Sequence, residues 1–213
     1  MADQLALANR ALRLLKQLPI TDITSATDAA AVILNEQWEA ALEEFLSEAF
    51  WNWAKTRDTL TEASPVPAFG WTHAFALPSD FVSVVGVNET YADTPSDVYE
   101  IENGFILTDD NVASDPAELN LEYIYKPTAS TLDAFCEGMD PKAAEAFVVL
   151  LASKIAPQLS QDGHRAAAEV LQRYYTVDLP KARARNGNQN RPPPRFPYQT
   201  SRGRDARFNF RNP

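Results

Sequence analysis

The sequence has few of the residues that build catalytic or metal sites. Its 213 residues include one cysteine, two histidines and seven glycines. A single cysteine closes no internal disulfide and assembles no thiolate metal site, so we expect folding in a reducing compartment. The glycines are too widely spaced for a phosphate-binding loop, and no Gly-x-Ser-x-Gly, His-Glu-x-x-His or Cys-x-x-Cys pattern occurs. The sequence therefore favours a protein that is not an enzyme and binds no cofactor or metal.

Long apolar runs are also missing. No stretch approaches the roughly 18 to 20 apolar residues that cross a membrane. The N-terminus shows no basic segment followed by an apolar run and a small-residue cleavage site. The longest apolar run, residues 146–152, is typical of a buried helix. We therefore expect no membrane partner and no secretory leader.

The charge is divided unevenly along the chain. The net charge is −10, yet the segment from Lys181 to the C-terminus holds nine basic residues and one acid, Asp205, which gives it a charge of +8. Residues 1–180 hold ten basic and 28 acidic residues, a charge of −18. An acidic body repels nucleic acid, whereas the basic segment attracts phosphates or acidic protein surfaces.

Hydrophobic spacing predicts two helices in the first quarter of the chain. Within residues 4–18, apolar side chains recur three and four positions apart, and Pro19 ends the pattern. A longer helix is predicted over residues 27–55, preceded by a capping box of Ser25 and Asp28. The apolar stripe of this second helix consists of Trp38, Leu42, Phe45, Ala49 and Trp53.

Residues 57–127 change to the pattern of a β-domain. Leu77-Pro78-Ser79-Asp80 predicts a turn, and Asn103-Gly104 is the preferred centre of a type I′ hairpin because both positions need positive φ. Alternation and β-branched residues predict strands at 71–76, 81–87, 98–102, 105–108 and 119–125. We expect a small antiparallel sheet or barrel.

Helical patterns return after Pro127. Asp140 and Pro141 predict the start of a core helix, because an acid caps the first turn and proline suits the first helical position. The apolar face of a last helix includes Val177, and Pro180 marks its end or a kink. From Ala182 onward no periodicity remains, so this segment is expected to be disordered or extended.

Together these segments predict an α+β fold that is mainly α. Residues 1–56 and 128–180 would form a four-helix bundle. Residues 57–127 would form an inserted small antiparallel β-domain, and residues 181–213 an extended, basic C-terminal arm.

Single residues that could carry chemistry have structural explanations. Neither His73 nor His164 has a ligand partner at metal-binding spacing, and Cys136 has no base near it in sequence. An enzyme that uses one of these three remains the alternative to be tested. We expect Trp53 to lie in the core, whereas Trp51 could be core or a subunit contact. The glutamates of the long helix, such as Glu39, Glu43 and Glu44, indicate a solvated or ring-lining acidic face.

The C-terminal arm has the clearest functional pattern, because it interleaves arginines with aromatic residues. Such a segment can dock on a protein, remain a solvated tail, or bind nucleic acid by phosphate contact and base stacking. We favour protein docking, since aromatics are unusual in purely solubilising tails. The candidate docking residues are Arg195, Phe196, Tyr198, Arg202, Arg204, Arg207, Phe208, Phe210 and Arg211.

Several local patterns follow one another between residues 5 and 180. They are Ala49, Trp53-Ala54, Arg57 and Leu60; then Leu77-Pro78-Ser79-Asp80; then Leu121, Tyr123 and Tyr125; and finally Ala146-Phe147 and Ile155-Ala156. In their order and spacing, the chain resembles the head-to-tail adaptor proteins of short-tailed bacteriophages, a family also called tail tubular protein A.

The resemblance implies a structural virion protein at the head-tail junction, made in the host cytoplasm. It implies a homo-oligomeric ring of twelve copies between the portal protein and the tail nozzle protein, with a contact to tail fibres. Viral DNA would pass through the ring without specific binding, and the arm would contact the portal. The alternative function, a DNA-binding or packaging accessory protein that uses the arm, remains open.

Overall fold

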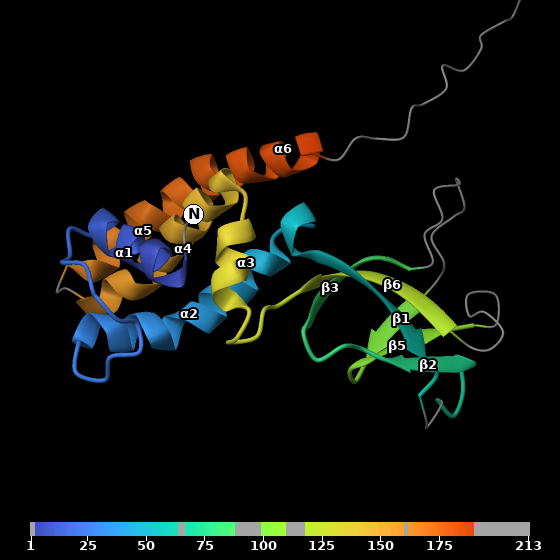
Figure 1. Ribbon diagram of the computed structural model, residues 1–213. Coiled ribbons are helices and arrows are strands. Elements are labelled where there is room, and N and C mark those ends of the chain that lie inside the picture. Colours follow the sequence, from blue (N-terminus) through green and yellow to red (C-terminus); the bar gives the residue numbers. More distant parts are fainter. Residues whose placement is uncertain (1–2, 64–66, 88–98, 110–117, 160–161, 190–213) are drawn as a thin grey trace, which may run out of the picture.

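The protein is elongated, with helices at one end and strands at the other (Figure 1). The computed structural model describes residues 3–63, 67–87, 99–109, 118–159 and 162–189. About 53% of these residues are helical and 21% lie in strands, so the fold is α+β and mainly α, as expected.

The element bounds are as follows. The helices are α1 (Gln4–Leu14), α2 (Ala29–Ser47), the 3-10 turn η1 (Asn52–Ala54), α3 (Leu132–Gly138), α4 (Pro141–Leu159), α5 (Gly163–Arg173), the π turn η2 (Tyr174–Asp178) and α6 (Leu179–Gln189). The strands are β1 (Lys55–Thr61), β2 (His73–Ala76), β3 (Phe81–Val87), β4 (Tyr99–Glu102), β5 (Phe105–Thr108) and β6 (Glu118–Tyr125).

The second helix is shorter than the sequence predicts. Asp28 is itself the N-cap and accepts hydrogen bonds from the amides of Ala30 and Ala31, so the expected capping box with Ser25 is wrong. The helix ends at Ser47 instead of continuing to residue 55. Trp51 then turns inward, where it is fully buried, stacks on Phe45 at 4.7 Å, and donates from Nε1 to the Phe45 carbonyl at 2.9 Å. This contact outweighs the continued helical pattern and lets β1 start at Lys55.

Helix α4 is the centre of the helical domain. It begins at the predicted position, where Asp140 accepts from the Lys142 amide at 2.9 Å. Its side chains are buried nearly all round, and Phe147 meets Trp38 of α2 edge-to-face at 5.1 Å. The half-buried Trp53 packs on the same core. The described residues contain five helical segments when α5, η2 and α6 are counted as one. This is one more than predicted, because the prediction did not include α3.

The last helix continues well past Pro180. The Leu179 amide donates to the Tyr174 carbonyl, a π-type bond that widens the helix just before the proline. The extra residue in this turn shifts the buried face, so Val177 is exposed while Asp178 and Leu179 face the core. Residues 182–189, which were expected to be disordered or extended, are therefore helical in α6.

The strands form two three-stranded antiparallel sheets, with orders β1-β6-β3 and β2-β5-β4. The hairpin between β4 and β5 has φ of 51° at Asn103 and 81° at Gly104, which confirms the predicted turn. The two sheets share a small core that includes Phe75, Ile106 and Leu121. The β-domain is thus a pair of small sheets.

Strand β6 belongs to both hydrophobic cores. Leu119, Leu121 and Tyr123 face the core between the sheets. Ile124 points to the opposite side, as alternation along a strand requires, and is completely buried in the helical core. The half-buried strand predicted from the sequence is therefore buried on both faces at its C-terminal end.

Candidate functional site

The first residues of the basic arm lie in α6, which is fixed to the body. We call this helix, Leu179–Gln189, the root of the arm. Asn186 is buried, and its Oδ1 accepts from the Asn52 amide at 2.9 Å while its Nδ2 donates to the Phe50 carbonyl at 2.7 Å. The Asn52 side chain donates in return to the Asn186 carbonyl at 2.9 Å. These bonds hold α6 against η1, so that the C-terminal end of α6 lies above the junction between the helices and the sheets (Figure 1).

Two arginines of this root are paired with acids of the body. Arg183 donates to both the backbone carbonyl and the carboxylate of Glu48 at the end of α2. Arg185 donates to Asp140 at 2.7 Å. Burial would raise the pKa of Asp140, but the hydrogen bonds from Arg185 and from the Lys142 amide outweigh it and keep this pKa below its ordinary value. Part of the arm's positive charge is therefore already paired with acids of the body at the protein surface.

The nine predicted docking residues, from Arg195 to Arg211, lie outside the described residues. The structure therefore locates the start of the arm only. That start is a helix in which Arg183 and Arg185 are paired with acids. The helix was not predicted, because the sequence lacks periodicity there.

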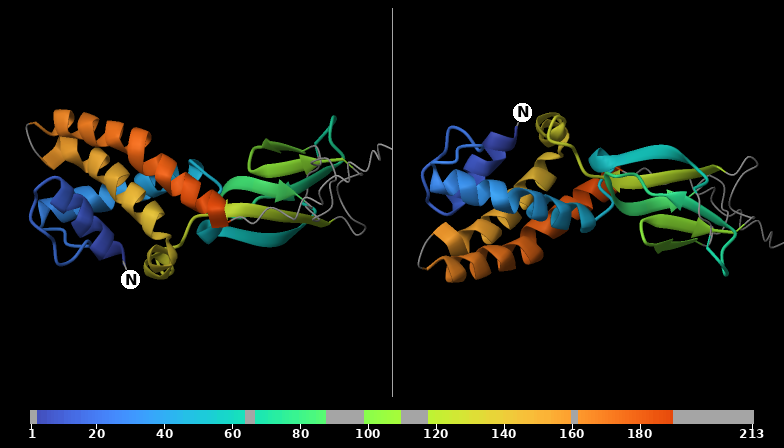
Figure 2. Two further views of the ribbon diagram at one scale, coloured as in Figure 1. Left: turned by 90° about the horizontal axis from the view of Figure 1, so that it is seen from above. Right: turned by 90° about the horizontal axis from the view of Figure 1, so that it is seen from below.

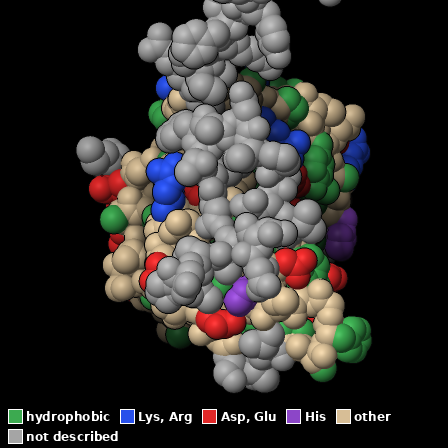
Figure 3. All heavy atoms as spheres, turned by 90° about the vertical axis from the view of Figure 1, so that its right-hand side faces the viewer, with side chains coloured by type: hydrophobic (Ala, Val, Ile, Leu, Met, Phe, Trp, Pro, Cys, Tyr) green, Lys and Arg blue, Asp and Glu red, His purple; other side chains and the backbone are tan. Residues whose placement is uncertain are grey.

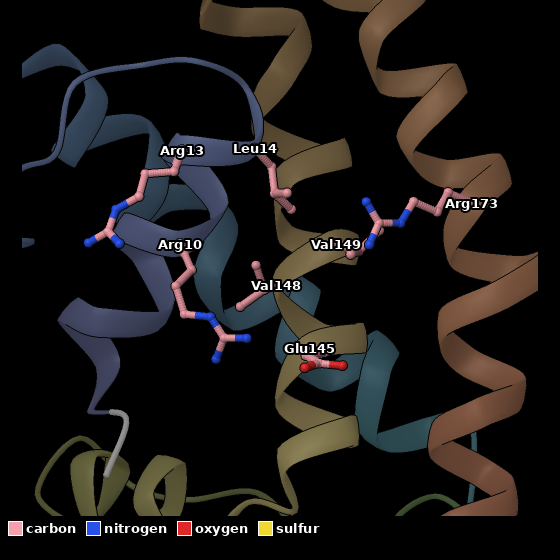
Figure 4. Close-up of a pocket in the computed structure, with 7 residues that line it drawn as sticks. All are labelled: Arg10, Arg13, Leu14, Glu145, Val148, Val149 and Arg173. Atoms are coloured by element: carbon pink, nitrogen blue, oxygen red, sulfur yellow. The ribbon is translucent and has the colours of Figure 1, made fainter.

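A groove with arginines along its rim crosses the outer face of α4. Its volume is about 250 Å³, and its floor is formed by Val148 and Val149. Arg10 reaches from α1 toward Glu145, and Arg173 reaches from α5 toward Val149 (Figure 4). The remaining lining residues are Arg13, whose head group points away from α4, and Leu14, which is 41% exposed. We call this feature the arginine groove.

The arginine groove holds cations that lack acidic partners. Residues 1–180 contain ten basic residues, and seven of them form ion pairs in the structure. The other three are Arg10, Arg13 and Lys16, and they have no ion-pair partner among the described residues. All three lie in α1 or just after it, so the unpaired positive charge of this acidic body is concentrated at one place.

The outward face of α2 has the opposite charge. Glu36, Glu39 and Glu43 are exposed there, with Ala40 among them. Lys126 donates to Glu39 at 2.8 Å and lies 3.8 Å from Glu43, so one ammonium is shared by two of the three carboxylates. We call Glu36, Glu39, Ala40 and Glu43 the acidic strip.

The groove and the strip lie on opposite sides of the helical domain. Seen from above, α1, α4 and α5 are in front, whereas from below α2 is in front (Figure 2). In the close-up of the groove, α2 passes behind α4 (Figure 4). The helical domain therefore has unpaired positive charge on one side and exposed carboxylates on the opposite side.

The sheet end carries exposed apolar side chains beside acids. Phe69 is 89% exposed, and Ile101 of the edge strand β4 is 45% exposed. A groove of about 470 Å³ near them is lined by Trp71, whose Nε1 donates to Glu100 at 2.9 Å. Figure 3 shows hydrophobic and acidic side chains together on this end. Such a surface is suited to contact with another protein.

The candidate nucleophile Cys136 lies in α3, and the candidate histidines His73 and His164 lie in β2 and α5. Cys136 is buried, and burial together with Asp133 and Asp3 raises the pKa of its thiol to about 12, so it stays protonated near neutral pH. His73 lies 2.8 Å from a carboxylate oxygen of Glu62. Within the described ranges, no three His, Cys, Asp or Glu side chains gather as metal ligands, and no helix is long and apolar enough to cross a membrane.

No protein-family model and no curated protein matches this chain.

Proposed function

We propose that this protein is a structural virion protein, a head-to-tail adaptor that forms a ring between a portal and a tail nozzle and lines the DNA channel. The proposal starts from the resemblance over residues 5 to 180 to the adaptors of short-tailed bacteriophages. The observation that carries it is the fixed root of the arm, because α6 joins a basic aromatic extension to an acidic body at one defined place. An adaptor needs such an attachment to bind a neighbour in a constant orientation.

The charge of the body agrees with a channel wall. A surface with net negative charge repels the DNA phosphates, so DNA can slide past it without being held. Residues 1–180 carry a charge of −18, and seven of their ten cations are already paired with acids. Repeated around a ring of twelve copies, this body would present a largely negative surface to viral DNA.

The arm serves in this proposal as the portal anchor. Six arginines follow Gln189, and aromatic residues such as Phe208 and Phe210 alternate with them. Arginine and aromatic side chains supply most of the binding energy in many protein interfaces. The exposed apolar residues of the sheet end would be free to meet the nozzle protein or tail fibres.

The test is removal of the arm without damage to its root. A deletion from Asn186 onward would also remove the hydrogen bonds to Asn52 and Phe50, so the chain is cut after Gln189. The truncated protein should keep the melting temperature of the full chain and lose binding to portal rings. Full-length protein with Phe208→Ala and Phe210→Ala should show an intermediate loss. Portal binding that survives truncation would contradict the proposal.

The alternative of a DNA-binding accessory protein is separated by salt dependence. Arginines that neutralise phosphates would give the full chain a DNA affinity that falls steeply between low and moderate salt. The adaptor proposal expects no measurable binding of duplex DNA at physiological salt, and loss of particle assembly on truncation. Strong, salt-dependent DNA binding that disappears with the arm would favour the alternative.

A further inference from the structure

We propose that the arginine groove of one copy binds the acidic strip of the next copy, and that this contact builds the ring. The inference rests on the proposed function, because it names the surfaces by which the copies of that ring would meet. It starts from the unpaired cations Arg10 and Arg13 and from the carboxylates of Glu36 and Glu39.

The positions of the two surfaces fit a head-to-tail contact. A ring with cyclic symmetry needs two different, complementary patches on each subunit, placed so that successive copies turn through a constant angle. The groove lies on the α1–α4–α5 side of the helical domain and the strip on the α2 side (Figure 2). A symmetric dimer would use one patch on both subunits, whereas here a patch and its complement face opposite directions.

The two surfaces have complementary charge, and the one acid among the described residues that line the groove, Glu145, is paired with Lys142. Arginine guanidinium groups bind carboxylates with paired, directional hydrogen bonds. Glu36, Ala40 and Glu43 lie on successive turns of α2, so the small side chain of Ala40 would let the helix approach the apolar floor at Val148 and Val149. The contact would thus combine an apolar centre with charged edges, as stable interfaces do.

Other occupants of the groove fit less well. The basic arm would be repelled by Arg10 and Arg13, since it brings further arginines to the same place. The remainder of the body is acidic and would repel a second copy in most orientations. The groove is the described location where unpaired positive charge on the body gathers, so it selects the orientation in which an acidic helix meets it.

Charge reversal tests the contact with two variants of the full chain. The first carries Arg10→Glu and Arg13→Glu, and the second carries Glu36→Arg and Glu39→Arg. Each alone should weaken self-association by on the order of a hundredfold, measured by sedimentation at low salt. The control for the first variant, Arg57→Glu with Arg165→Glu, lowers the net charge by the same amount at exposed positions that do not line the groove, and should associate like the wild type.

An equimolar mixture of the two reversed variants gives the decisive measurement. In the mixture, each groove meets a strip of opposite charge on the other variant, so assembly should return to within about tenfold of wild type. Failure of the mixture to assemble, unchanged assembly of either variant alone, or wild-type protein that stays monomeric at low salt would overturn the inference.

The same experiment separates this inference from the proposed function. Closed rings that bind the portal but ignore the charge reversals would leave the adaptor function standing and remove the contact. Charge-dependent dimers or open chains that never close and never bind a portal would keep the contact and remove the adaptor function.

Discussion

Asn52 and Asn186 bind each other reciprocally across 134 residues of sequence, each through its side chain to the backbone of the other. The Asn52 amide donates to Oδ1 of Asn186, and Nδ2 of Asn52 donates to the Asn186 carbonyl, both at 2.9 Å. This pair satisfies backbone groups at the start of η1 and near the end of α6 at once. These two hydrogen bonds hold α6, the first helix of the arm, against the body.

Replacing Asn186 should weaken the attachment of α6 to the body. Asn186→Ala leaves the Asn52 amide and the Phe50 carbonyl without their partners in a partly buried place, so we expect a loss of about 1–3 kcal/mol in the free energy of unfolding. Hydrogen exchange should accelerate in α6 more than in α4. Asn188→Ala, an exposed neighbour on the same helix, is the matched control and should change little. Equal effects of the two substitutions would contradict the assigned role.

The contact between α4 and α5 depends on the absence of a side chain at Gly163. A Cβ there would lie 2.0 Å from the Ala156 carbonyl oxygen and 2.9 Å from the Cα of Pro157. Gly163→Ala should therefore force the two helices apart and destabilise the protein by at least about 1–3 kcal/mol in a urea titration.

Gly187 in α6 provides the control for that substitution. Nothing lies within 4 Å of a Cβ built there. Gly187→Ala should stabilise the helix by up to about 1 kcal/mol, because alanine loses less conformational freedom than glycine. A Gly163→Ala variant as stable as Gly187→Ala would show that α4 and α5 are not this close.

Removal of the Tyr174 hydroxyl is expected to stabilise the protein. Tyr174 is fully buried, and its hydroxyl has no hydrogen-bond partner among the described residues. Since a buried polar group without a partner carries a desolvation cost, Tyr174→Phe should raise the free energy of unfolding by up to about 1 kcal/mol. The neighbouring Tyr175→Phe, at a side chain 48% exposed, should be neutral. Destabilisation by Tyr174→Phe alone would point to a bond that the hydroxyl makes in solution.

The pair of Asp140 and Arg185 should give the protein an acid-sensitive step. The pKa of Asp140 is below its ordinary value of 3.8 in the folded protein, so its stabilising effect is complete above that value and is lost as the pH falls through the folded pKa. Wild-type protein should lose stability below about pH 4 more steeply than Asp140→Asn, measured as urea midpoints across pH. Asp162→Asn, an exposed N-cap whose side chain caps nothing, should keep the wild-type slope. Parallel curves for wild type and Asp140→Asn would refute the assignment.

Features set by short-range chemistry could be predicted from the sequence. The Asn103-Gly104 turn and the helix start at Asp140 depend on conformational preferences and caps that two or three residues define. In contrast, α6 contains Asn186, Gly187 and Asn188, which are poor helix formers, and it is held by partners far away in sequence. Tertiary contacts therefore determine it, and periodicity gives no sign of them.

The candidate surfaces were visible in the sequence only in part. Arg10 and Arg13 lie three residues apart, which places them near one another on a helix. Only the packing of α1 and α5 on α4 shows that a groove lies beside them. Only the ion pairs among the described residues show that, apart from Lys16, the other cations of the body are paired. The charge difference between the body and the arm is evident in the sequence. The smaller charge difference within the body, between the cations of α1 and the carboxylates of α2, becomes evident only once the helices are packed.

Ile124 and Tyr123 are neighbours on one strand, yet each is built into a different core. Loss of either core would remove a wall of the other, so the helices and sheets should melt in a single cooperative transition and resist bending about the strand that joins them. A force applied at the sheet end would then be transmitted to the helices through a stiff connection. This property is useful in a protein that transmits strain between two larger assemblies.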